Sequence, residues 1–161
     1  LLHYVFSNEM YNRERVDYLI SLKVPQQLIK VGADVNKLNE DGENVLIAAV
    51  RALACTRTVK SILTRTNNVN LTACLGSKNR TAFGRAALNY KWAPMYNEMA
   101  KCVRVMQLLL RAGADPYLDS EWQDSVFSDR VEIIKKLVVD YRLALLKPDT
   151  SDGYVYYEYE L

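Results

Sequence analysis

The stretch that decides the fold is Gly32-Ala33-Asp34-Val35-Asn36, which returns in altered form as Gly113-Ala114-Asp115-Pro116. A weaker copy, Asn67-Asn68-Val69-Asn70, lies between them, and Asn36 and Asn70 are 34 residues apart. Each copy follows apolar residues at helical spacing, which indicates a helix that ends at a Gly or Asn suited to the left-handed backbone conformation. A recurrence of this length is typical of a stack of similar structural units.

A second recurring stretch lies after each turn. It reads DGENVLIAAV at residues 41–50, returns as NRTAFGRAA at residues 79–87, and is truncated to LHYV at residues 2–5. The alanine pairs allow a first helix to pack closely against its neighbours, and a leucine-rich second helix supplies the bulk of the core. Because one such pair cannot bury its apolar face alone, the pattern predicts that helix pairs stack on one another.

Together these stretches resemble the ankyrin-repeat family, whose units combine a tight turn, a Thr-Pro-Leu-His-x-Ala-Ala helix and a helix that ends in Leu-Leu-x-x-Gly-Ala-Asp. The resemblance implies an all-α solenoid of about four helix-turn-helix repeats joined by β-turn or hairpin loops. The expected domain covers residues 1–148, and an acidic, tyrosine-rich segment follows at residues 149–161. The repeats are expected at residues 1–38, 39–73, 74–118 and 119–147.

The chain departs from the family pattern at several points. The Thr-Pro pair is replaced by Asn44-Val45 and Thr81-Ala82, which predicts turns that are held less tightly. His3 alone stands at the family's histidine position, and we expect it to form a hydrogen bond with a turn backbone. Repeats one and three carry insertions, near residues 9–23 and 90–99, while repeat four has little room for a first helix.

The insertion in repeat three mixes aromatic residues, methionines and a proline. Exposed residues of these types make adaptable contact surfaces, and Trp and Tyr are enriched among the residues that dominate binding energy. Folded inward, the same residues would simply cover a lengthened helix. The sequence leaves both interpretations open.

The net charge of +2 conceals a strong segregation of charge along the chain. Residues 51–111 contain eleven basic residues and one acidic residue, whereas residues 1–50 have a net charge of −2 and residues 112–161 a net charge of −6. A concentrated positive field attracts acidic partners and accelerates their association. The alternative is that the charges are spread around the solvated faces of the helices.

The resemblance implies that partners contact the turn tips and the exposed side of the first helices. The expected partner is therefore a protein with an acidic surface or segment, bound in a basic groove of repeats two and three. The residues expected to contact it are Arg51, Lys78, Arg80, Arg85, Asn89, Tyr90, Lys91 and Trp92.

The sequence contains no pattern that indicates catalysis. It has no glycine-rich phosphate loop, no nucleophile elbow and no cluster of metal ligands, so we expect no enzymatic activity, no cofactor and no metal. The three cysteines are widely spaced and are expected to be free thiols in a reducing compartment. Nucleic acid is a less favoured partner because both ends of the chain are acidic.

No apolar run approaches the ~20 residues that span a bilayer, and an intracellular location is expected. The opening residues lack an initiator Met, which indicates a piece of a longer chain. An alternative function is therefore the substrate-recruiting part of a larger enzyme or effector. The irregular repeats also resemble those of ankyrin proteins from intracellular bacteria and large viruses.

Overall fold

The computed structural model describes residues 2–6, 23–70, 73–75, 78–119, 121–124 and 128–146. These residues are mainly helical, as the sequence predicts, and include one short antiparallel β-hairpin. Apart from Lys23, the expected segments at residues 9–23 and 149–161 lie outside this part of the chain. The elements are α1 (Leu2–Val5), α3 (Val24–Lys30), α4 (Val45–Arg51), α5 (Thr56–Leu63), β1 (Ala73–Leu75), β2 (Lys78–Arg80), α6 (Ala82–Trp92), α7 (Tyr96–Arg111), the 3-10 helix η1 (Glu121–Gln123) and α8 (Ser128–Leu146).

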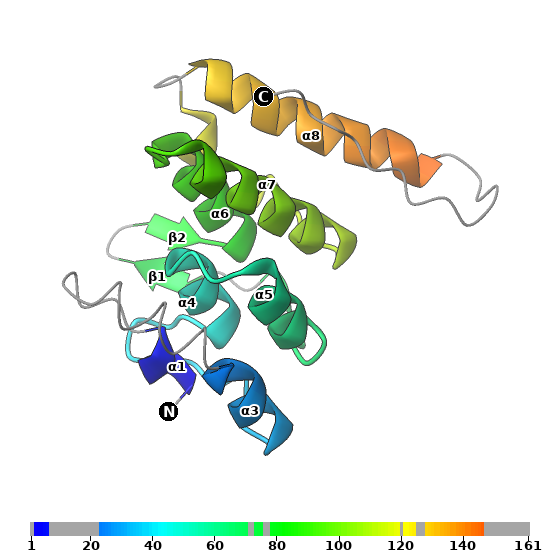
Figure 1. Cartoon of the computed structure of the whole chain (residues 1–161). Helices are drawn as coiled ribbons and strands as arrows, with labels where there is room; N and C mark the ends of the chain where they lie inside the picture. Colours follow the sequence, from blue (N-terminus) through cyan, green and yellow to red (C-terminus); the bar gives the residue numbers. More distant parts are fainter. Residues whose placement is uncertain are drawn as a thin grey trace.

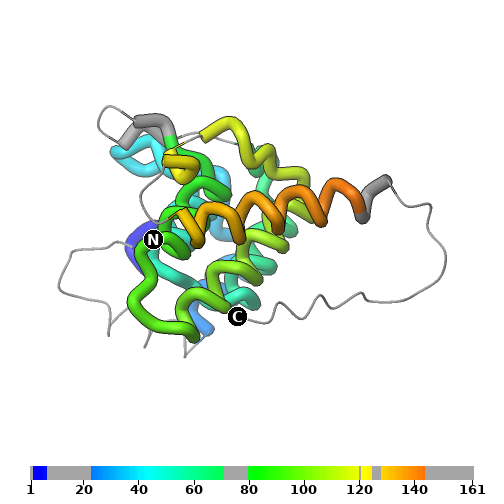
Figure 2. The backbone as a smooth tube through the Cα atoms, turned by 90° about the horizontal axis from the view of Figure 1, so that it is seen from above, coloured from blue at the N-terminus to red at the C-terminus, as the bar shows by residue number. Residues whose placement is uncertain are grey.

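The helices are arranged in two layers (Figure 1). In the inner layer, α4 packs between α1 and α6, and the hairpin lies at its edge. In the outer layer, α5 packs between α3 and α7. Each inner helix contacts an outer helix, so the described chain is a stack of helix pairs. The last helix, α8, packs across α6 and α7 at one end of the stack (Figures 1 and 2).

Small side chains allow the inner helices to approach one another. Ala48 and Ala49 on α4, and Ala86 and Ala87 on α6, are all fully buried. Larger side chains on the outer helices, such as Met106, fill the space between the layers. The expected division between a helix of small residues and a bulky one is only partly present, because the inner helices also bury large side chains, among them Leu46 on α4 and Phe83 on α6.

Two polar side chains cap the inner helices at their N-termini. Asn44 Oδ1 accepts a hydrogen bond from the Ile47 amide at 2.9 Å, and Thr81 Oγ1 accepts one from the Gly84 amide at 3.0 Å. Each bond satisfies one of the amides that a helix start leaves without an intrahelical partner. The turns that lack a Thr-Pro pair thus still begin their helices with a side-chain cap.

His3 makes the structural contact that the sequence predicts for it. Its Nε2 lies 2.6 Å from the carbonyl oxygen of Lys37, which is 34 residues away along the chain. Because a carbonyl can only accept, the imidazole donates this bond through Nε2–H. The first inner helix is thereby joined to the following turn.

Two asparagines join successive turns along the stack. Asn36 Nδ2 donates to Arg65 O at 3.0 Å, and Asn36 Oδ1 accepts from Asn67 N at 2.8 Å. Asn70 makes the same pair of bonds one unit later, at 3.2 and 2.7 Å, with Gly113 O and Asp115 N. The recurrence of asparagine in the sequence therefore marks a recurring bridge between neighbouring units.

We expect Asn36→Ala to lower the free energy of unfolding by about 1–2 kcal/mol, because it removes two hydrogen bonds that join neighbouring units. Urea unfolding followed by circular dichroism would measure the change. Asn67→Ala is the matched control, because Asn67 contributes its backbone amide to this bridge and its side chain is exposed. Equal losses in the two variants would show that the asparagine side chain does not stabilise the stack.

Candidate functional site

Helix α6 is buried on almost every side, so the few side chains that reach its surface define its contact face. They are Arg85, Asn89 and Trp92, and Trp92 is 61% exposed. Their spacing of four and three residues puts them on one side of the helix. On α4 the residues before Arg51 are buried and Arg51 itself is partly exposed. We refer to Arg51, Arg85, Asn89 and Trp92 as the inner face.

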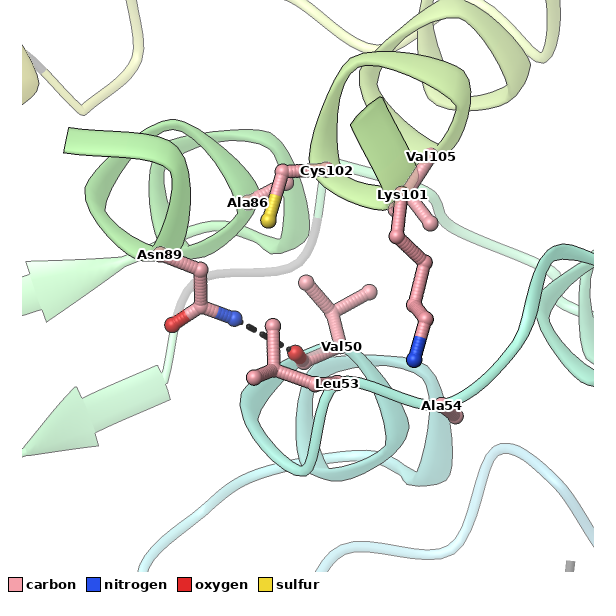
Figure 3. A pocket seen from close by; sticks show the side chains of 8 residues that line it. All are labelled: Val50, Leu53, Ala54, Ala86, Asn89, Lys101, Cys102 and Val105. Carbon is pink, nitrogen blue, oxygen red and sulfur yellow. Dashed lines mark hydrogen bonds between the residues drawn. The ribbon is translucent and has the colours of Figure 1, made fainter. Parts of the chain in front are cut away.

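Asn89 fixes α6 against α4 at this face. Its Nδ2 donates to the carbonyl oxygen of Val50 at 2.7 Å (Figure 3). The Val50 carbonyl lies at the C-terminal end of α4 and also accepts a hydrogen bond from the Leu53 amide at 3.1 Å, so Asn89 adds a second donor to it. Asn89 is thus a structural tie as well as a surface residue.

A small pocket lies beside Asn89, between the end of α4 and helices α6 and α7 (Figure 3). The Cys102 sulfur faces this pocket, and burial raises the pKa of the Cys102 thiol to about 12. A thiol that stays protonated is a poor nucleophile, so we expect Cys102 to contribute packing contacts to the pocket wall and not to react covalently with a ligand. Its lining residues are Val50, Leu53, Ala54, Ala86, Asn89, Lys101, Cys102 and Val105.

Two of the arginines near the inner face already have carboxylate partners. Arg51 Nη2 lies 3.0 Å from Glu43 Oε2, and the Glu43 side chain is fully buried. Arg80 Nη2 lies 2.7 Å from Glu121 Oε2. Together with Arg85 these residues bring three guanidinium groups and two carboxylates within electrostatic reach of one another. One positive charge of this group is therefore not balanced within it.

Arg85 is the guanidinium without a carboxylate of its own in this group. Burial, followed by the positive charges of Arg80 and Arg51, lowers the pKa of Arg85, although Glu43 and Glu121 act in the opposite direction. The Arg85 Nε is buried and has no hydrogen-bond partner among the described residues. Because Arg85 as a whole is partly exposed and carries the unbalanced charge, it suits pairing with an incoming acidic side chain through the exposed part of its guanidinium group and not through the buried Nε.

Not all of the residues expected to contact a partner reach the surface. Tyr90 and Lys91 are 0% and 3% exposed, so a partner cannot contact their side chains. The Lys91 Nζ instead donates to the carbonyl oxygen of Asp124 at 2.9 Å. The physical reason is that α6 continues to Trp92, which turns these two residues toward packed neighbours. Lys78 lies on β2, and its side chain is outside the described part of the structure.

The insertion at residues 90–99 is partly core and partly surface. Arg130 Nη1 on α8 donates to the carbonyl oxygens of Lys91 at 2.8 Å and Ala93 at 2.9 Å. A cation at this position also interacts favourably with the C-terminal end of the α6 dipole. The turn is therefore held in place, and the large apolar side chains it exposes are Trp92, Met95 and Tyr96.

The sequence analysis did not single out the residues that balance the arginines. Glu43 and Glu121 lie in the two acidic blocks of the chain, yet both reach across to the basic block. One signal was present for Glu43, because it stands two residues before the apolar run that begins at Val45. A carboxylate at such a position needs a cationic partner when it is buried.

Three or more side chains suited to hold a metal ion do not come together anywhere among the described residues. None of the described helices is long and apolar enough to span a membrane. No protein-family model and no curated protein matches the chain. Its function is therefore inferred from its own surface.

Proposed function

We propose that the chain is a non-catalytic ankyrin-repeat protein whose inner face binds an acidic segment of another protein. The family assignment is supported by the recurring turn and helix stretches and by the stacking of helix pairs in two layers. It is also supported by the bridges of Asn36 and Asn70, which recur one unit apart. The free thiols of Cys55 and Cys102 are compatible with an intracellular, reducing location.

The observation that carries the binding proposal is the position of Arg85. Its guanidinium lies near Arg51 and Arg80, which are each paired with a carboxylate, while its own Nε has no partner among the described residues. A carboxylate from a partner would balance the remaining positive charge of this group. The inner face is thus suited to one anchoring acidic side chain more than to a long acidic run.

Trp92 adds a second, apolar anchor to the same face. It stands seven residues after Arg85, which corresponds to about 10 Å along the axis of α6. An extended peptide covers this distance in about three residues. The proposed ligand is therefore an extended segment with an Asp or Glu and, about three residues away, a large apolar side chain.

We expect a random peptide-display library selected on the protein to yield peptides that share an acidic residue and an apolar residue at this separation. Arg85→Gln should weaken the selected peptides about tenfold to one hundredfold, because it removes a charge-assisted hydrogen bond worth about 1.5–3 kcal/mol. Fluorescence anisotropy with labelled peptides would measure the affinities.

Arg104→Gln is the matched control, because Arg104 is exposed on α7 and lies in the outer layer. It removes the same charge and should change the affinity less than twofold. Selected peptides without an acidic residue, or equal affinities for the Arg85→Gln and Arg104→Gln variants, would refute binding at the inner face.

A further inference from the structure

The outer layer carries a second basic surface that the inner-face proposal does not use. Helices α3, α5 and α7 lie side by side, and their buried residues face the inner layer. On the opposite side each of the three helices exposes at least one cation. We name this set the outer basic face, and it consists of Lys30, Arg57, Lys60, Arg104 and Arg111.

The charges of the outer basic face are not balanced locally. Glu98 is the only acidic residue within the sequences of α3, α5 and α7. None of the five cations forms an ion pair with a carboxylate in the described part of the chain. This differs from the inner face, where Arg51 and Arg80 are both paired. Most of the uncompensated positive charge of the central block therefore lies on the outer layer.

Exposed apolar side chains lie at one end of this surface. Met95 and Tyr96 stand at the start of α7 and are 61% and 60% exposed. Tyrosine is enriched where proteins meet the headgroup region of a bilayer, since its ring is apolar and its hydroxyl is polar. Apolar side chains next to a cluster of Lys and Arg are typical of proteins that lie on an anionic membrane surface.

We propose that the outer basic face is a docking surface for a bilayer containing anionic phospholipids. The cations attract the lipid headgroups, and Met95 and Tyr96 insert at the boundary between headgroups and acyl chains. A nucleic acid would use the same charges, but it gives no role to two apolar side chains placed at the end of the basic surface. The helices lie on the membrane and do not cross it.

Vesicle co-sedimentation of the whole chain tests this proposal. The vesicles contain one part phosphatidylserine to three parts phosphatidylcholine, with pure phosphatidylcholine for comparison. We expect binding only to the anionic vesicles, weakening as salt is raised, because each Lys or Arg near such a surface contributes about fivefold. Arg57→Gln/Lys60→Gln should therefore lower the affinity about 25-fold.

The matched control is Lys135→Gln/Lys136→Gln, which removes two exposed cations from α8 and should leave the affinity within about twofold. Met95→Ala/Tyr96→Ala should weaken vesicle binding about fivefold while a short DNA duplex shows no such dependence. Tighter binding to the duplex than to the anionic vesicles would overturn the proposal. Equal binding to both vesicle types, or equal effects of the α5 and α8 variants, would also overturn it.

Discussion

Replacing Gly84 with alanine is expected to destabilise the protein by about 3–5 kcal/mol, through overpacking and the loss of buried hydrogen bonds. A methyl group at this position in the first turn of α6 would overlap the carboxylate of Asp119. Asp119 is itself buried and accepts hydrogen bonds from the amides of Thr81 at 3.3 Å and Glu121 at 3.2 Å. If the carboxylate moves aside, both amides lose their acceptor.

Urea unfolding followed by circular dichroism would measure this loss. Gly113→Ala is the comparison, because an added methyl there would meet nothing within 4 Å and the only cost is the positive φ of 89°. That strain is worth about 1–2 kcal/mol. In an Asp119→Ala background, Gly84→Ala should cost much less. Losses of equal size at Gly84 and Gly113 would contradict the proposed clash.

Trp122→Ala is expected to destabilise the protein by about 3–5 kcal/mol, the usual cost of removing a large buried aromatic side chain. Trp122 is 1% exposed, and its Nε1 donates to the carbonyl oxygen of Pro116 at 3.0 Å. Its ring also meets Phe83 edge to face, with the ring centroids 6.1 Å apart. The residue thus ties η1 to α6, so that its loss would loosen the end of the stack where α8 packs.

Trp92→Ala is the matched control, since the second tryptophan of the chain is mostly exposed and should contribute less than about 1 kcal/mol to stability. Thermal or urea unfolding gives both values. Tryptophan fluorescence separates the two sites, because buried Trp122 should account for the shift in emission on unfolding. A Trp92→Ala variant as unstable as Trp122→Ala would show that the burial of these two side chains is misassigned.

The repeating local features of the fold could be predicted from sequence because they rest on short-range chemistry. Asn36 and Asn70 recur since each bridges to the next turn, and Ala48-Ala49 and Ala86-Ala87 recur since two helices must approach closely there. His3 could likewise be assigned a bond to a turn backbone. The asparagines and the alanine pairs make the same contacts in each unit, so they recur at a regular spacing that can be recognised in the sequence.

The exposed residues of the candidate site were predicted only in part. Arg51, Arg85, Asn89 and Trp92 reach the surface, whereas Tyr90 and Lys91 are buried. The difference depends on where α6 ends, because eleven residues of helix carry its buried faces further than the seven residues of α4. Helix ends are set by packing and by capping groups such as the distant Arg130, which local sequence does not reveal.

The distribution of charge could not be read from blocks of sequence. The basic block suggested a strongly positive groove, but Glu43 and Glu121 arrive from the flanking acidic blocks and neutralise Arg51 and Arg80. Counting charges along the chain ignores such pairing between distant segments. Once it is included, the inner face retains one guanidinium that has no carboxylate partner among the described residues, and the larger excess of positive charge lies on the outer helices.

The asparagine bridges also determine how the protein should respond to mechanical force. Asn36 and Asn70 each span a boundary between neighbouring units through a donor and an acceptor at once, so both bonds must break together when that boundary opens. Under tension along the stack, each boundary would resist until its bridge fails and would then yield abruptly. The chain would therefore extend in discrete steps, each step being the unfolding of one unit.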